Sequence, residues 1–221
     1  MGQDQEEAWR VSTERGVFIV FEGGDGVGKT TQVDLLCAWL GKAGHEVLKT
    51  FEPGDSLLGA MIRRIVLDPA TGDMSPRAEA LLYAADKAQH IFSVVRPALE
   101  HGAVVVCDRY IDSMLAYQGA GRALRLTDLE FIARWATEDL RPDLTVVLDA
   151  KLSDGVHAKS EKDRLESAGD VFHERARLFF LELARRHTER YLVLDARASR
   201  EEIAAKVADR VLPLLSPARH P

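Results

Sequence analysis

A glycine-rich stretch between a short apolar run and a helical segment constrains this chain most. The apolar residues 18–21 lead directly into Gly-Gly-Asp-Gly-Val-Gly-Lys-Thr at residues 23–30, which fits the pattern G-x-x-x-x-G-K-[ST]. Apolar side chains then recur with helical spacing from Val33 to Leu40. A buried strand, a glycine turn and a helix form the context of a phosphate-binding loop. An ordinary turn that contains a lysine is the weaker interpretation, because both flanks have the required pattern.

The residue types of the loop indicate how it would bind phosphate. Glycines allow several backbone N–H groups to converge on phosphate oxygens, and the following helix adds its partial positive charge. Lys29 is expected to reach the β- and γ-phosphates, and the Thr30 hydroxyl to bind Mg²⁺. The residues expected to bind the nucleotide are Gly23, Gly24, Asp25, Gly26, Val27, Gly28, Lys29, Thr30 and Thr31. The sequence therefore predicts a nucleoside-triphosphate site.

Composition limits the remaining possibilities. A chain of 221 residues with 46% hydrophobic residues suits one domain, which we expect at residues 16–215 after an acidic tail at 1–15. The net charge of −6 argues against broad binding of nucleic acid or of an anionic membrane. The two cysteines form no disulfide framework, and the first residues lack the apolar core of a signal peptide. We therefore expect a cytoplasmic enzyme with no nucleic-acid or membrane partner.

Short apolar runs alternate with helical segments along the chain. The runs expected to be strands cover residues 18–21, 46–48, 103–107, 144–148 and 191–194. This alternation is typical of a parallel sheet with helices on both faces. We therefore expect an α/β fold with a doubly wound five-stranded parallel sheet flanked by helices. Between residues 151 and 169 the apolar pattern fades and charges gather, so we expect a short mobile lid there.

Helical periodicity also predicts which faces are buried. A helix capped by Ser56 is expected to carry an apolar face with Leu58, Met61, Ile62 and Ile65. A long helix over about 76–100 is expected to bury Leu81, Ala85, Ala88, Phe92, Val95 and Leu99. The opposite face of that helix carries Tyr83, Lys87 and His90. A further helix is expected to begin at Thr127.

The ends of the strands distinguish between classes of phosphate-loop proteins. The chain has no Asn-Lys-x-Asp guanine signature of a GTPase, and its strand at 103–107 runs into Asp108-Arg109 rather than the Asp-Glu of motor ATPases. An aspartate near Mg²⁺ followed by an arginine suits a kinase whose acceptor carries phosphate. Ligands gather at the carboxyl ends of such strands, which places Asp25, Glu52, Asp108 and Asp149 around one crevice.

Five stretches of this sequence, in their order and spacing, resemble bacterial thymidylate kinases. They are FEGGDGVGKTTQ, EPGDS, LLYAADKAQH, DRYIDSMLAYQGAGR and DRLES. The resemblance covers the chain from about residue 16 to the last helix. It implies the nucleoside-monophosphate-kinase type of fold, usually homodimeric. It also implies transfer of the γ-phosphoryl group of ATP to dTMP with Mg²⁺, giving dTDP for dTTP synthesis.

The resemblance also implies an acceptor site. Asp25 would bind the sugar 3′-OH, with a loop-stabilising turn as its alternative. Tyr83 would stack on thymine, with ordinary packing as its alternative. Arg109 would hold the dTMP phosphate, with a surface ion pair as the weak alternative. Helical periodicity cannot choose between Arg63 and Arg64, and the resemblance selects Arg63 as a second phosphate ligand. The other expected acceptor contacts are Glu52, Lys87, Ser113, Tyr117 and Gln118, although Gln118 could also be a helix-surface residue.

Three departures from the family pattern stand out. Phe51 and Asp55 replace the usual arginine and glycine around Glu-Pro-Gly, and Lys87 replaces the arginine expected against the thymine carbonyl. Members with glycine at the position of Gly26 usually supply arginines from the lid, and this lid contains only Arg164. The expected catalytic residues are Lys29, Asp108, Arg109 and Arg164, with Thr30 and Asp108 at the metal.

The lid leaves some alternatives open. Lys159 and Lys162 could assist Arg164, or Arg164 could instead form a structural ion pair with a nearby carboxylate. A nucleotide-binding regulator with weakened catalysis, or a kinase for another deoxynucleotide, are the alternative functions.

Overall fold

The computed structural model describes residues 15–151, 164–165 and 168–215. Its centre is a five-stranded sheet with the strand order β2-β3-β1-β4-β5. The strands are β1 (Phe18–Gly23), β2 (Val47–Phe51), β3 (Val104–Asp108), β4 (Leu144–Asp149) and β5 (Tyr191–Asp195). All neighbouring pairs are parallel. The predicted fold class is therefore confirmed, and β2 is longer than the sequence pattern indicated.

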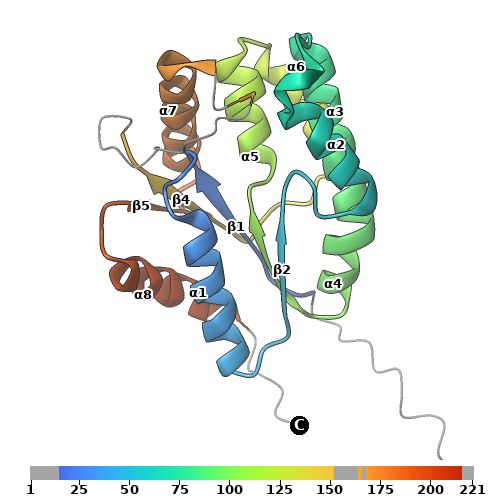
Figure 1. Ribbon diagram of the computed structural model, residues 1–221. Helices are drawn as coiled ribbons and strands as arrows, with labels where there is room; N and C mark the ends of the chain where they lie inside the picture. The colour runs from blue at the N-terminus through green and yellow to red at the C-terminus, as the bar shows by residue number, and fades with distance from the viewer. Residues whose placement is uncertain (1–14, 152–163, 166–167, 216–221) are drawn as a thin grey trace, which may run out of the picture.

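Helices cover both faces of the sheet (Figure 1). The α-helices are α1 (Lys29–Lys42), α2 (Leu57–Leu67), α3 (Pro76–His90), α4 (Arg96–Glu100), α5 (Ile111–Met114), α6 (Leu126–Ala136), α7 (Asp170–Arg186) and α8 (Arg200–Val211). Two π-helical segments, η2 (Ile91–Val95) and η3 (Leu115–Gly121), continue α3 and α5, and the 3₁₀ segments are η1 (Pro69–Thr71) and η6 (Leu212–Leu214). Helices α1 and α8 pack on one face, and α2 to α7 pack on the other.

The central strand shows why the chain forms three layers. Successive side chains of a strand point to opposite faces, so Phe18 and Val20 join the core under α2 to α7. Ile19 and Phe21 join the core under α1 and α8. Because both faces are covered, β1 is buried along its whole length, as continuous apolar runs in parallel sheets indicate.

The buried face of the long helix was predicted incorrectly. Helices α3, η2 and α4 follow one another over residues 76–100, and Val95 and Leu99 are buried as expected. Leu81 and Phe92, however, are 57% and 72% exposed. The face expected to be polar, with Lys87, is buried instead. Its lysine finds a buried carboxylate partner, which periodicity alone cannot reveal.

Helix α2 shows the same kind of difference. Ile62 is buried as predicted, but Leu58, Met61 and Ile65 are exposed. Ser56 caps this helix by accepting a hydrogen bond from the Gly59 N–H, as its sequence position indicated. Helix α6 begins at Leu126, one residue before the start expected at Thr127.

Some predictions fall on residues outside the description. Of the expected tail at 1–15, only Arg15 is described, and most of the expected lid at 151–169 lies outside the described residues, including Lys159 and Lys162. The domain boundaries at 16 and 215 therefore stay predictions. Among the described residues, no helix is long and apolar enough to cross a membrane.

Candidate active site

The phosphate loop connects β1 to α1 with the geometry that its glycines allow. Gly23 and Gly28 have φ angles of 134° and 93°, which favour glycine. A Cβ atom at Gly23 would lie 2.4 Å from the Leu148 carbonyl oxygen, so this position has no room for a side chain. The Lys29 ammonium donates hydrogen bonds to the carbonyls of Gly23 (3.2 Å) and Gly24 (2.6 Å). Burial, and next the charge on Arg109, lower the pKa of Lys29 to about 8.

Thr30 and Asp108 form a pair that fits a magnesium ion. The Thr30 hydroxyl donates to Asp108 Oδ2 at 3.0 Å. Asp108 Oδ1 is buried and has no hydrogen-bond partner in the described part of the chain. A buried carboxylate oxygen without a partner is costly, and a metal ion or its water would satisfy it. Among the described residues, no group of three or more His, Cys, Asp or Glu could hold a metal ion.

Arg109 joins the phosphate loop to the neighbouring cavity. Its backbone has a φ angle of 72°, and its N–H donates to the Phe21 carbonyl, which turns the side chain back over the end of β1. The guanidinium donates to the Gly23 carbonyl and the Ser113 hydroxyl at 3.0 Å each, and to Asp25 at 2.6 Å. Burial would lower the pKa of Arg109, but Tyr117, Asp25 and Asp108 hold it well above its ordinary value.

Glu22 is a buried residue of this site that the sequence reasoning missed. Its Oε1 accepts from the N–H groups of Tyr110 (2.8 Å) and Ser113 (3.1 Å), and its Oε2 accepts from the Ser113 hydroxyl (2.6 Å). Burial, and then the charge on Asp112, raise the pKa of Glu22 to about 7. A carboxylate at the end of an otherwise apolar buried strand was the signal that could have identified it.

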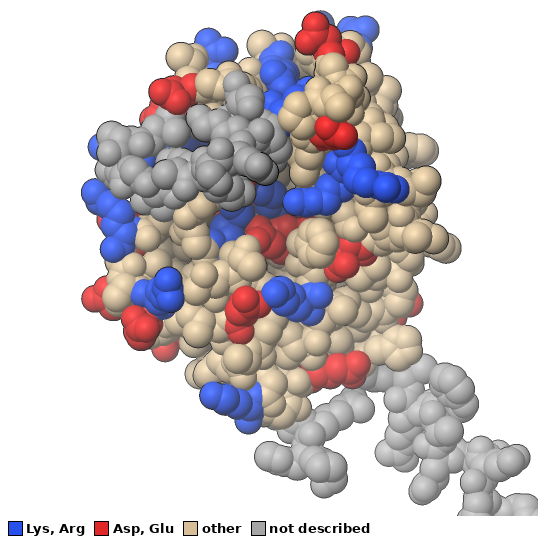
Figure 2. Space-filling model, in the orientation of Figure 1, with Lys and Arg blue, Asp and Glu red and all other residues tan. Residues whose placement is uncertain are grey.

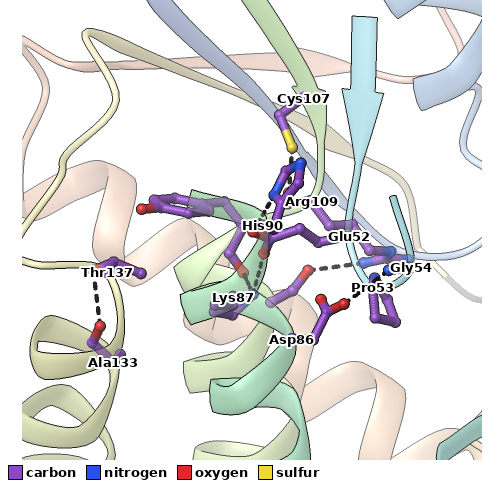
Figure 3. Close-up of polar contacts among 12 residues, drawn as sticks. Glu52, Pro53, Gly54, Asp86, Lys87, His90, Cys107, Arg109, Ala133 and Thr137 are labelled. Atoms are coloured by element: carbon purple, nitrogen blue, oxygen red, sulfur yellow. Dashed lines mark hydrogen bonds and ion pairs between the residues drawn. The ribbon is translucent and has the colours of Figure 1, made fainter. Parts of the chain in front are cut away.

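A buried charged cluster supports one wall of the cavity. The Glu52 carboxylate lies between the Lys87 ammonium, which donates to it, and His90, whose Nδ1 is 2.8 Å from Glu52 Oε1 (Figure 3). Burial alone would raise the pKa of Glu52, but Lys87 and His90 hold it below its ordinary value. Asp86, next to Lys87, accepts from the Gly54 N–H at 3.0 Å. Lys87 is therefore fixed by the protein, with Nζ also donating to the Tyr110 carbonyl at 2.9 Å.

A cavity of about 110 Å³ opens between this cluster and Arg109. Every side chain predicted to bind the acceptor lines it: Asp25, Glu52, Arg63, Tyr83, Lys87, Arg109, Ser113, Tyr117 and Gln118. Figure 2 shows acidic and basic side chains intermixed around the upper middle of the molecule, over the carboxyl ends of β1 and β2. The structure thus brings the phosphate loop and the predicted acceptor residues to one edge of the sheet.

Arg63 and Arg64 are separated by the structure. Arg63 lines the cavity and donates to the Pro53 carbonyl at 2.7 Å, while its guanidinium carbon lies 5.7 Å from the centre of the Phe51 ring. Both arginines are exposed, but Arg64 does not line the cavity.

Arg164 lies against a different carboxylate. It donates to Glu79 and, at 2.9 Å, to the Val66 carbonyl. The buried Glu79 also accepts from Gln118 at 2.9 Å and from Arg122 at 3.3 Å. This geometry is the structural ion pair left open as the alternative for Arg164, and its catalytic role stays a prediction.

The fold and this site define the class of the protein. A phosphate loop at the carboxyl edge of a parallel sheet faces a cavity that is lined by arginines and aromatic rings. This arrangement is that of a phosphate-loop kinase acting on a small acceptor.

Comparison with known proteins gives the family. The family model described as thymidylate kinase matches residues 21–207. A thymidylate kinase of Cutibacterium acnes is 58% identical over 201 residues, covering 91% of this chain and 98% of that protein. A thymidylate kinase of Deinococcus radiodurans is 48% identical over 196 residues, covering 87% and 95% of the two chains. The crystal structure of a thymidylate kinase from Ehrlichia chaffeensis matches with a TM-score of 0.74 and 27% identity, covering 88% and 98%.

The chain belongs to the thymidylate kinase family. Its activity is accordingly the ATP-dependent phosphorylation of dTMP to dTDP.

Proposed function

We propose that the γ-phosphoryl group of ATP is transferred to dTMP where the phosphate loop meets the acceptor cavity, with Arg109 at the junction. The observation that carries this proposal is the position of the Arg109 guanidinium. It contacts the Gly23 carbonyl of the loop and the Asp25 and Ser113 side chains, which both line the acceptor cavity. A cation in that position can bind the acceptor phosphate and offset the charge that develops during transfer.

The phosphate loop would bind the donor. Residues 23–31 surround the phosphates, and the Lys29 ammonium exchanges its carbonyl partners for the β- and γ-phosphate oxygens. Thr30 and Asp108 would hold Mg²⁺, which supplies positive charge next to the phosphates when it is bound. The Asp108 Oδ1 atom, which has no hydrogen-bond partner in the described part of the chain, supports this assignment.

The cavity would bind the phosphate, the sugar and the base of dTMP. Arg63 and Arg109 bind the phosphate, Asp25 accepts from the 3′-OH, and Tyr83 lies under the thymine ring. Lys87 supplies an ammonium toward the base, and Ser113, Tyr117 and Gln118 complete the surroundings. Because the acceptor phosphate oxygen is already anionic, no separate strong base is required. Positioning and charge neutralisation then provide the rate, with Arg164 of the lid as a further candidate cation.

We also propose that the protein is a homodimer and works in the cytoplasm with no nucleic-acid partner. Exposed apolar side chains of α2, α3 and η2, including Leu57 (88% exposed), Met61, Leu81 and Phe92, support a dimer face. Such a surface is unusual unless a partner covers it. Two free cysteines support a reducing compartment, and the net charge of −6 disfavours nucleic acid.

The test is Mg²⁺-dependent release of ADP from ATP with dTMP, dUMP, dGMP, dCMP or AMP offered singly. We expect turnover largely confined to dTMP, and a fall in kcat/KM of about 10³-fold or more in Arg109→Ala, because the acceptor phosphate loses its main cation. Arg64→Ala removes an exposed arginine on α2 and is the matched control, with turnover unchanged.

Other outcomes would change the proposal. Binding of ATP and dTMP with no release of ADP would identify a regulator with weakened catalysis, which the ion pair of Arg164 with Glu79 makes worth testing. Preference for another nucleotide would retain phosphoryl transfer and contradict the roles of Tyr83 and Lys87.

A further inference from the structure

A second cavity lies behind the active site, on the side of the sheet covered by α6 and α7. Its volume is about 480 Å³, which is within the range of pockets that hold small molecules. It is bounded by α5, α6, the segment around Arg141, the end of α7 and the first residues of β5. Glu22 lines this cavity, whereas its hydrogen-bond partner Ser113 lines the acceptor cavity. The reaction described above does not use this space.

The inner wall of the second cavity is acidic. The Tyr191 hydroxyl donates to Asp112 Oδ2 at 2.7 Å, and the half-buried Asp112 lines the cavity beside Glu22. Asp112 and Glu22 lie close enough for the charge of Asp112 to raise the pKa of Glu22, and burial raises the pKa of Asp112. A buried carboxylate and a half-buried one that repel each other favour an occupant with N–H donors at this wall.

The exposed part of the same cavity lining carries basic side chains beside Glu130 and Asp139. These are Arg134, Arg141, His187 and Arg190. Arg134 and Arg141 both contact one carboxylate, that of Asp139, at 3.2 Å each. Because two guanidinium groups share a single exposed partner, they retain donors for an incoming anion. Phosphate is the anion whose geometry suits a pair of arginines.

We propose that this cavity binds a guanine nucleotide, with the base at Asp112 and the phosphate at Arg134 and Arg141. Guanine presents a ring N–H and an amino group side by side, so it can donate two hydrogen bonds to carboxylate oxygens. Adenine places its amino group beside a ring nitrogen that accepts, and thymine has its N–H between two carbonyls. A carboxylate wall therefore selects guanine and disfavours the base of the enzyme's own acceptor.

Glu22 would connect the two cavities. It accepts from the Ser113 hydroxyl and N–H, and the Ser113 hydroxyl accepts from Arg109 at 3.0 Å. An occupant that donates to Asp112 reduces the electrostatic repulsion between Asp112 and Glu22. Glu22 in turn holds Ser113, which positions Arg109. The occupant would thus be an effector whose binding and dTMP binding change each other by the same factor.

The test compares the binding of GMP and IMP to the full chain by calorimetry, with the active site filled by adenosine joined to thymidine through a polyphosphate. IMP has the same ring N–H as GMP but lacks the amino group. We expect GMP to bind about tenfold more tightly than IMP, the effect of one hydrogen bond to a charged acceptor. In Asp112→Asn this difference should disappear.

The arginines provide a second, independent comparison. Arg141→Ser should weaken both nucleotides about tenfold, because each loses a contact to its phosphate. Arg200→Ser removes an exposed arginine at the start of α8 and should leave both affinities unchanged. Equal binding of GMP and IMP, no binding of either, or loss of GMP when the active site is filled would each overturn the proposal. These comparisons decide it even if Asp112→Asn does not fold.

Discussion

At the scale of single residues, the site depends on side chains that are held by other side chains. Arg109 points into the junction of loop and cavity because Asp25 and Ser113 both bind its guanidinium. Ser113 is held in turn by Glu22, a carboxylate with no access to solvent. The Arg109 side chain is therefore largely ordered before substrate binds, which lowers the entropic cost of binding the acceptor phosphate.

Replacing Glu22 tests this support. In Glu22→Gln the amide group cannot accept hydrogen bonds at its nitrogen, so one of the three bonds from Tyr110 and Ser113 is lost. We expect kcat/KM for dTMP to fall by about 10- to 100-fold while the KM for ATP changes little. Steady-state kinetics with each substrate varied measures this. Equal loss for both substrates would point to general destabilisation, and partial rescue in Glu22→Asp would support the positioning role.

The single residue Asp86 is expected to make the free energy of unfolding depend on pH. Burial, and then the charge on Glu52, raise the pKa of Asp86 from 3.8 to about 6. Because the folded protein binds this proton more tightly, Asp86 contributes stability that is present below about pH 4 and is lost as the pH rises through about 6. Asp86→Asn does not titrate.

We therefore expect the free energy of unfolding of Asp86→Asn, relative to the unchanged protein, to increase between about pH 4 and pH 7 and then stay level. Urea unfolding of both proteins at each pH measures the difference. A difference that is independent of pH would contradict the raised pKa of Asp86.

At the scale of elements, helix α2 is fixed against α3 by a close contact at a glycine. A Cβ atom on Gly59 would lie 2.4 Å from Asp86 Oδ1 and 2.7 Å from the Ser56 hydroxyl oxygen. Asp86 belongs to α3, and Ser56 caps α2, so one atom would disturb both the packing and the cap. The two helices lie side by side in Figure 1, next to the acceptor cavity that Arg63 of α2 lines.

Gly59→Ala tests this contact. We expect a loss of about 1–3 kcal/mol in the free energy of unfolding, because an added methyl group has no space. Gly41→Ala is the matched control, since a Cβ atom there meets nothing within 4 Å and Gly41 lies in helix α1. That control should be neutral or gain up to about 1 kcal/mol. Equal effects of the two substitutions in chemical denaturation would show that α2 can move away from α3.

At the scale of the whole molecule, most apolar side chains fill two cores, and some large ones remain exposed at the surface. The sheet buries its own side chains beneath α1 and α8 on one face and α2 to α7 on the other. Large apolar side chains nevertheless remain exposed on α2 and α3, which Figure 1 shows at the edge of the molecule next to β2. A second copy of the chain is the partner we propose for this surface.

The oligomeric state tests that surface. Phe92→Glu places a charge within the proposed interface, so we expect a dimer in the unchanged protein and a monomer in the variant. Leu178→Glu, at a residue that is 53% exposed on α7, is the control and should remain dimeric. Sedimentation velocity distinguishes these states. A monomer before substitution, or a dimer after it, would contradict the proposal.

The sequence by itself determined the fold class and the position of the phosphate loop, because both depend on local order along the chain. The apolar run of β1, the glycines and the helical period of α1 are adjacent, and alternating strands and helices have few parallel arrangements. Arg109 and Ser113, which follow strand β3, line the acceptor cavity because strand ends meet at one edge of the sheet, and their roles there stay predictions.

Only the tertiary structure decided which long-range partner each polar group finds. The burial of Lys87 depends on Glu52, which is distant in the sequence, and the pairing of Arg164 depends on Glu79. Phe92 is exposed because no other element of the described chain packs over it. Periodicity records that one face of a helix is apolar, but not whether the core or a partner will cover it. Glu22 was missed for the same reason, because the donors that make its burial tolerable come from another strand end and the following helix.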